Sequence, residues 1–179
     1  MPAQSTDDND RLEREAVKWR KSLLFAFKFA RQGAVRSLRL QRNLRIHWTA
    51  GTAVLVWNLC VRPSTVLVTV SILTIALVMS IELLNTAVEH LTDLATAGNY
   101  HELAKWAKDA SAAAVLVSSV GAIAVAVLLL ADTWPWHFLL LTRANLIGAA
   151  QSAVGIVLLI VWGVTSGLRQ VERRKHHDN

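Results

Sequence analysis

The sequence has little cysteine and lacks the common nucleotide-binding loops. Cys60 is the only cysteine among 179 residues and lies in an apolar segment, which excludes a small secreted domain held by disulfides. No apolar stretch precedes Leu23, so we expect no cleaved signal peptide. The Gly-x-x-x-x-Gly-Lys and Gly-x-Gly-x-x-Gly motifs are absent, which excludes Walker and Rossmann nucleotide folds. Gly-x-Ser-x-Gly and His-Glu-x-x-His are also missing, so neither a hydrolase nucleophile motif nor a zinc motif is available.

Charged residues are absent from four stretches, at 46–61, 63–81, 110–131 and 144–168. At about 1.5 Å per residue, three of them are long enough to cross a hydrocarbon core of about 30 Å, and the first is nearly so with flanking residues. We therefore predict an all-α integral membrane helical bundle. Its spans are expected at about 46–61, 64–95 and 108–131, with a fourth at 144–168. Four glycines in the fourth stretch permit close helix packing but are weak evidence for an interface.

The remaining segments complete the predicted organisation. Residues 1–10 are expected to form a disordered acidic tip, and 11–45 an amphipathic helix lying in the membrane interface, because apolar residues recur there at helical spacing. A soluble helix packed on a partner remains an alternative for this segment. Residues 11–131 would form the main membrane domain, followed by an outer loop at 132–143 and a basic tail at 169–179.

The basic residues are distributed unevenly. Eleven of the 19 lie in 1–45, two in 96–108 and four in 169–175. The positive-inside rule therefore places the N-terminus, the middle loop and the C-terminus in the cytoplasm. This topology explains the formal net charge of +6 better than nucleic-acid binding does, so we expect no nucleic-acid partner.

The second predicted span ends with a stripe of polar residues, Glu82, Asn85, Glu89 and Asp93. At about 100° per residue they fall within roughly 60° of one another on a helix. Carboxylates in a membrane are costly and need a cation, a proton or a partner. Oxygen ligands suit Mg²⁺, and an unliganded carboxylate could act as a general base for an alcohol.

Other readings of this stripe remain open. The carboxylates could close a structural ion-pair network with Lys105, Lys108, Arg42 or Arg45, and Asp93 could simply face water. From the residues alone, the stripe indicates a metal-dependent membrane enzyme or a cation transporter. The transporter is disfavoured because the ionisable groups cluster at one membrane boundary instead of on several spans.

Several motifs together resemble the prokaryotic diacylglycerol kinase and undecaprenol kinase family. Residues 82–89 read Glu-Leu-Leu-Asn-Thr-Ala-Val-Glu, and the resemblance continues through Asp93, 100–109 and 111–115. Upstream, 27–30, Gly33 and 42–47 are similar to the undecaprenol-kinase-like branch. The resemblance implies a homotrimer of small subunits in the bacterial inner (plasma) membrane, with active sites between subunits that phosphorylate a lipid alcohol with ATP and Mg²⁺.

The resemblance also implies roles for individual residues. Glu82 would be the general base, Asn85 would position the reacting groups, Glu89 would bind Mg²⁺, Lys108 would face the phosphates, and Asp109 would support the polar site. The nucleotide would lie near Asp93, Tyr100, His101 and Glu102.

Two features depart from the family pattern. The metal-binding glutamate of the family falls on Gln41, a neutral amide that can coordinate Mg²⁺ through its carbonyl oxygen but contributes no charge. The span at 144–168 is additional to the usual three. The expected function is an ATP- and Mg²⁺-dependent kinase that converts diacylglycerol to phosphatidate or undecaprenol to undecaprenyl phosphate. The alternative is a non-catalytic lipid- or nucleotide-binding membrane protein on the same scaffold.

Overall fold

The computed structural model describes the backbone of residues 4–139 and 144–177, and the side chains of 22–139 and 144–166. Over these residues it consists of helices and loops, without strands, which confirms the all-α prediction. The helices are α1 (Gln4–Leu40), α2 (Arg42–Val61), α3 (Thr65–Thr96), α4 (Glu102–Asp132) and α5 (Leu146–His177).

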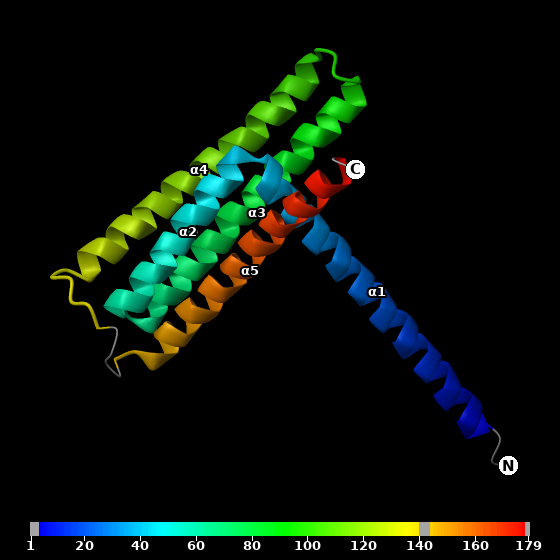
Figure 1. Cartoon of the computed structure of the whole chain (residues 1–179), viewed down its shortest axis with the longest axis horizontal. Coiled ribbons are helices and arrows are strands. Elements are labelled where there is room, and N and C mark those ends of the chain that lie inside the picture. The colour runs from blue at the N-terminus through cyan, green and yellow to red at the C-terminus, as the bar shows by residue number, and fades with distance from the viewer. Residues whose placement is uncertain (1–3, 140–143, 178–179) are drawn as a thin grey trace.

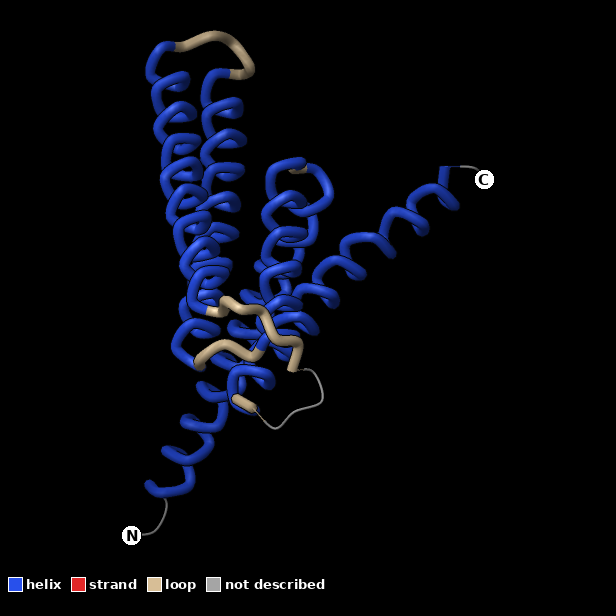
Figure 2. Tube along the Cα trace, turned by 90° about the vertical axis from the view of Figure 1, so that its left-hand side faces the viewer, coloured by secondary structure: helices blue, strands red, loops and turns tan. Residues whose placement is uncertain are grey.

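Helices α2 to α5 pack side by side as a bundle, and α1 leaves it at an angle (Figure 1). Helices α3 and α4 form a long antiparallel hairpin, whereas α5 lies against α1, α2 and α3. The start of α2, the end of α3 and the start of α4 lie toward one end of the bundle. Figure 2 shows the N-terminal part of α1 and the C-terminal part of α5 extending away from it.

Three helices in the described part of the chain are long and apolar enough to cross a membrane: Thr65–Thr96, Glu102–Asp132 and Leu146–Ser166. The expected first span, 46–61, is helical within α2, but α2 is not among these three. Arg45, His47 and Asn58 make it more polar, and Asn58 is fully buried in the bundle. Three of the four predicted spans are therefore supported by length and composition, and the first, which lies in a more polar helix packed on α3 and α5, stays a prediction.

The helix boundaries differ from the prediction at the N-terminal side. Helix α1 begins at Gln4, inside the segment 1–10 that was expected to be disordered. The acidic residues in its first turns explain this start, because negative charge is favourable near a helix N-terminus. Gln41 is extended (φ −92°, ψ 119°) and separates α1 from α2, which divides the expected helix 11–45. The interfacial position of α1 and the homotrimer stay predictions.

The turn between α3 and α4 sets the start of α4, and it therefore places the predicted site residues Glu102 and Lys108 on that helix. Ala97 and Gly98 have positive φ angles of 49° and 77° and end α3. The His101 side chain then caps α4 by accepting a hydrogen bond from the backbone N–H of Leu103 at 3.2 Å. Helix α4 therefore begins at Glu102, six residues before the predicted membrane span at 108–131, so its second turn carries Lys108.

Apolar side chains from α1, α2 and α3 form a small core of Leu38, Leu44 and Met79. Helix α5 approaches α2 closely because its glycines leave room. A Cβ atom on Gly155 would lie 2.8 Å from Leu55 Cδ1, and one on Gly163 would lie 2.7 Å from Trp48 Cζ2.

Candidate active site

The polar stripe predicted on the second span lies on α3, and its membrane-side end is buried. Glu82 is 2% exposed and Asn85 is 8% exposed, while Glu89 is half-buried and Asp93 is exposed. The buried Thr86 hydroxyl donates a hydrogen bond to the Glu82 backbone carbonyl at 3.0 Å, so this hydroxyl is satisfied within the helix and leaves the Glu82 carboxylate without a bond from it. The stripe thus runs from a buried carboxylate to one that faces solvent.

The Glu82 carboxylate faces His47 at the start of α2. His47 Nε2 lies 3.5 Å from Glu82 Oε1, and this oxygen is buried without a hydrogen-bond partner in the described residues. The His47 side chain is 23% exposed. An imidazole beside an otherwise unpartnered buried carboxylate can orient it and exchange a proton with it.

His47 is a site residue that the sequence analysis quoted only within a motif and gave no role. One signal could have found it: it is the only histidine in the uncharged stretch 46–61. A titratable side chain in an apolar membrane segment is a functional hypothesis by default.

Asn85 connects α3 to α4. Its Nδ2 donates to Glu89 Oε1 at 3.0 Å, and its Oδ1 accepts from the Ser111 hydroxyl at 2.7 Å. These two contacts fix the orientation of the amide. Ser111 Oγ also lies 2.9 Å from the backbone carbonyl of Lys108, so the hydroxyl joins Asn85 to the α4 turn that carries Lys108. Ser111 is a second residue to which the sequence analysis assigned no role.

A polar hollow of about 350 Å³ lies at the tip of the α3–α4 hairpin. Lys108 Nζ contacts Asp93 Oδ1 there at 2.5 Å. The lining brings together five of the residues predicted to act at the site, Asp93, Tyr100, His101, Lys108 and Asp109. Glu102 is exposed on the first turn of α4 and is not part of this lining.

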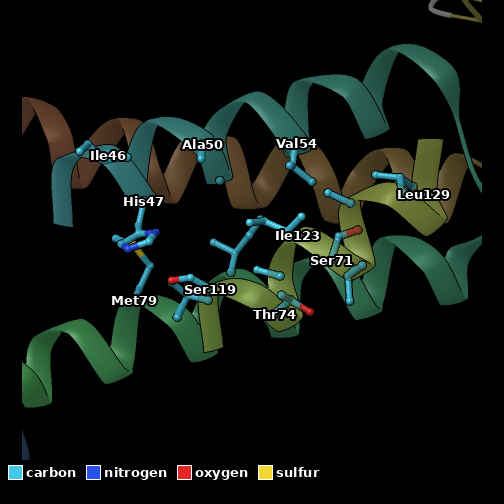
Figure 3. Close-up of a pocket in the computed structure, with 16 residues that line it drawn as sticks. Ile46, His47, Ala50, Val54, Ser71, Thr74, Met79, Ser119, Ile123 and Leu129 are labelled. Carbon is cyan, nitrogen blue, oxygen red and sulfur yellow. The ribbon is translucent and has the colours of Figure 1, made fainter. Parts of the chain in front are cut away.

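An apolar groove of about 360 Å³ lies between α2, α3 and α4. Figure 3 shows His47 and Met79 near one end of it and Leu129 at the other. Glu82 follows Met79 by one turn of α3, so the polar end of the groove adjoins the buried carboxylate. This groove is not among the features predicted from the sequence.

The predicted metal ligands Gln41 and Glu89 belong to different elements of the fold. Gln41 lies half-buried at the corner between α1 and α2, whereas Glu89 is engaged by Asn85. Within the described residues, no group of three or more His, Cys, Asp or Glu side chains is close enough to hold a metal ion. Metal binding at Glu89 and Gln41 stays a prediction.

The described site contains the parts needed to transfer a charged group to an apolar substrate. An apolar groove ends at a buried carboxylate, and a polar hollow carries an ammonium group. The hydrogen bonds of Ser111 and Asn85 connect the two regions.

Comparison with known proteins identifies the family. The family model of prokaryotic diacylglycerol kinase matches residues 28–130. Diacylglycerol kinase of Synechocystis sp. is 39% identical over 125 residues, covering 70% of this chain and 71% of that protein. Undecaprenol kinase of Bacillus subtilis is 42% identical over 95 residues, covering 53% of this chain and 76% of that protein. No solved structure matches the chain significantly. The family match includes Glu82, Asn85, Glu89 and Lys108, and it ends before α5 begins. The chain therefore belongs to the prokaryotic diacylglycerol kinase family and is a lipid kinase.

Proposed function

We propose that the protein transfers the γ-phosphoryl group of ATP, with Mg²⁺, to the hydroxyl of a lipid alcohol. The lipid is diacylglycerol, which would become phosphatidate, or undecaprenol, which would become undecaprenyl phosphate. The observation that carries this proposal is the junction between an apolar groove and a buried carboxylate. The groove can hold an apolar chain, and its polar end at His47 adjoins Glu82.

Glu82 would act as the general base. As the lipid oxygen attacks the γ-phosphorus, the bond to the β–γ bridging oxygen breaks, ADP leaves, and Glu82 accepts the hydroxyl proton. The proton then passes to solvent. His47 would act as a positioning residue, because it lies 3.5 Å from the Glu82 oxygen that has no hydrogen bond.

The nucleotide would occupy the polar hollow at the α3–α4 tip. Lys108 offers a cation for the phosphates, and the hollow also presents Tyr100 and His101. In the structure, Lys108 is paired with Asp93, so nucleotide binding would exchange a carboxylate partner for phosphate oxygens. Ser111 and Asn85 connect the Lys108 turn with Glu89, which supports a continuous path from nucleotide to acceptor.

The donor chemistry of the site fits Mg²⁺, although one chain offers few ligands. Mg²⁺ commonly binds one or two carboxylates together with waters and substrate phosphates. Glu89 would supply the carboxylate and Gln41 an amide carbonyl. When bound, the ion would neutralise charge on the phosphates during transfer.

Helix α4 supports assembly into the homotrimer with shared sites. Leu129 is its only buried residue among those described, and Leu116, Val120 and Val127 are exposed. In a membrane, these side chains can contact lipid or another copy of the chain. We place the protein in the bacterial inner membrane with both termini in the cytoplasm, because basic residues are concentrated in the terminal segments.

A substrate panel tests the proposal. The purified full chain in neutral detergent would be given Mg²⁺-ATP labelled at the γ-phosphate, with diacylglycerol, undecaprenol or a short polyprenol. Label should appear in at least one lipid and depend on Mg²⁺. Binding of ATP or lipid without transfer to any of the three would favour the non-catalytic alternative instead.

A further inference from the structure

A second hollow, of about 300 Å³, lies where α1, α2 and α5 meet. It is lined by Leu38, Arg39, Arg45, Trp48, Thr49, Gly163 and Ser166. Its α5 residues lie outside the part of the chain matched by the family model, which ends at residue 130. The mechanism described above uses none of the lining residues.

Two arginines line this hollow, and no carboxylate is among its lining residues in the described part of the chain. Arg39 donates from Nη2 to the Thr165 backbone carbonyl at 3.1 Å, and from Nε to the Ser166 backbone carbonyl. Arg45 is exposed, and its guanidinium has no ion pair or hydrogen bond with the residues whose side chains the structure describes. The sequence has no acidic residue from 16 to 81, so α2 and the adjoining part of α1 offer these arginines no carboxylate.

This arrangement is suited to an anion with several oxygens. Guanidinium groups are weakly hydrated and bind phosphate oxygens through two or more parallel hydrogen bonds. Arg39 is held in place by the α5 carbonyls, so its position in the hollow is fixed before any ligand arrives. Arg45 supplies the second charge, which has no partner among the described side chains.

The position along α5 indicates where the anion comes from. Ser166 lies two residues before the end of the uncharged stretch 144–168, and the end of a span lies at the level of the lipid headgroups. The Trp48 indole N–H donates to the Leu159 backbone carbonyl at 3.0 Å, which holds the ring against α5. Val161 and Val164 are exposed on the same turns of α5 and offer apolar surface to acyl chains.

We propose that this hollow binds the headgroup phosphate of an anionic phospholipid, whose acyl chains lie along the exposed apolar side chains of α5. Lipid bound there would contact α1, α2 and α5 at once. Because the start of α2 also carries His47, the site lies on the same helix as the active-site histidine. The proposal does not depend on the kinase reaction, because it concerns binding alone.

The test measures lipid binding by the full chain in neutral detergent. Native mass spectrometry would quantify phosphatidylglycerol bound at increasing lipid concentration, for the parent protein, Arg45→Gln and Arg36→Gln. Arg36 is exposed on α1 and does not line the hollow, so this control removes the same charge elsewhere. We expect the apparent Kd to rise about fivefold in Arg45→Gln, the loss of one basic contact at a membrane surface, and to change by less than about twofold in Arg36→Gln.

Two further arms identify the ligand. Phosphatidylcholine should bind more weakly than phosphatidylglycerol, and millimolar inorganic phosphate should not displace the bound lipid. Equal losses in the two arginine variants would mean a diffuse charge effect and would overturn the site. Full displacement by inorganic phosphate would overturn the assignment to a lipid.

A third variant tests the shape of the hollow without changing its charge. Gly163→Leu would push the Trp48 ring aside, because even a Cβ atom there meets Trp48 Cζ2 at 2.7 Å. It should weaken phosphatidylglycerol binding while both arginines remain. Unchanged binding in a folded Gly163→Leu protein would contradict the proposal, and the Arg45→Gln comparison decides the matter if this variant does not fold.

Discussion

Helices α4 and α5 are both apolar enough to cross a membrane, but α4 packs mainly against one helix and α5 packs against three. Helix α4 packs mainly against α3 and has one buried residue among those described, Leu129. Helix α5 contacts three helices and is joined to them by hydrogen bonds from Trp48, Arg39 and Gln151. Hydropathy alone therefore does not distinguish how extensively each helix packs against the rest of the bundle.

This difference distinguishes two sides of the bundle. We call the side that contains α4 the working face and the side that contains α5 the supporting face. The side of the bundle that contains α4 carries the groove, the hollow at the hairpin tip and the contact between Ser111 and Asn85. The side that contains α5 carries close glycine contacts and contributes to none of these features. We infer that α4 is left open to substrate and to other copies of the chain, whereas α5 closes the bundle on its other side. The following predictions test this division.

The largest effect is expected from Glu82→Gln. The change keeps the shape of the side chain but removes the proposed general base, so kcat should fall by about 10² to 10⁴-fold. Phosphate transfer to the lipid measures it. Asp132→Asn is the matched control, because Asp132 is an exposed carboxylate at the far end of α4. If Glu82→Gln kept more than half of the parent kcat, the proposed role of Glu82 as general base would be contradicted.

The second-largest effect on activity is expected from a substitution that blocks the apolar groove. Ala126 lines the groove on α4, whereas the neighbouring Val127 is exposed and does not. Ala126→Trp should lower kcat/KM for the lipid by about tenfold or more, because a misplaced substrate loses its orientation toward the catalytic group. The KM for ATP should be nearly unchanged. Val127→Trp adds the same ring beside the groove, and equal losses in the two variants would disprove lipid entry at this place.

His47→Phe tests whether His47 positions the Glu82 carboxylate on the working face. Removing the imidazole takes the neighbouring Nε2 atom away from Glu82 Oε1, which has no hydrogen bond among the described residues, so kcat should fall by up to about 10²-fold through loss of orientation. The KM for lipid should stay close to that of the parent protein. His47→Gln retains an N–H donor and should recover part of the loss. If the two variants were equally impaired, the imidazole would act by filling space.

The sequence predicted which polar residues share a face of α3, because the helical period alone sets that placement. Glu82 and Asn85 are buried and adjacent on that face, as their spacing of three requires. The pattern could not show that His47 faces Glu82, because the two belong to different helices and periodicity within one segment carries no information about register between segments. The same limit applies to Ser111 and Asn85.

The sequence was less informative about where helices begin. The predicted span at 108–131 followed the uncharged stretch 110–131, and the helix that contains it extends further, because it starts at Glu102 behind a His101 cap. Charge marks the membrane boundary and not the end of a helix, and helices continue into water when capped. The glycines of the last span permitted close approach without predicting it, and the structure identifies Leu55 and Trp48 as the side chains near them.

The smallest effect on catalysis is expected from Asn145→Ala, on the supporting face. The Asn145 side chain accepts from Thr65 Oγ1 at 2.8 Å and from Gly148 N at 3.0 Å, and it donates to the Pro63 carbonyl. Its φ of 39° is also less favourable for alanine than for asparagine. We expect a loss of about 1–3 kcal/mol in stability, seen as a lower unfolding temperature in detergent, with kcat per folded molecule within about twofold of the parent protein. Asn43→Ala, at an exposed position, should change neither quantity. A large fall in kcat without a fall in stability would mean that α5 takes part in the reaction, because a purely supporting helix can lower activity only by lowering the folded fraction.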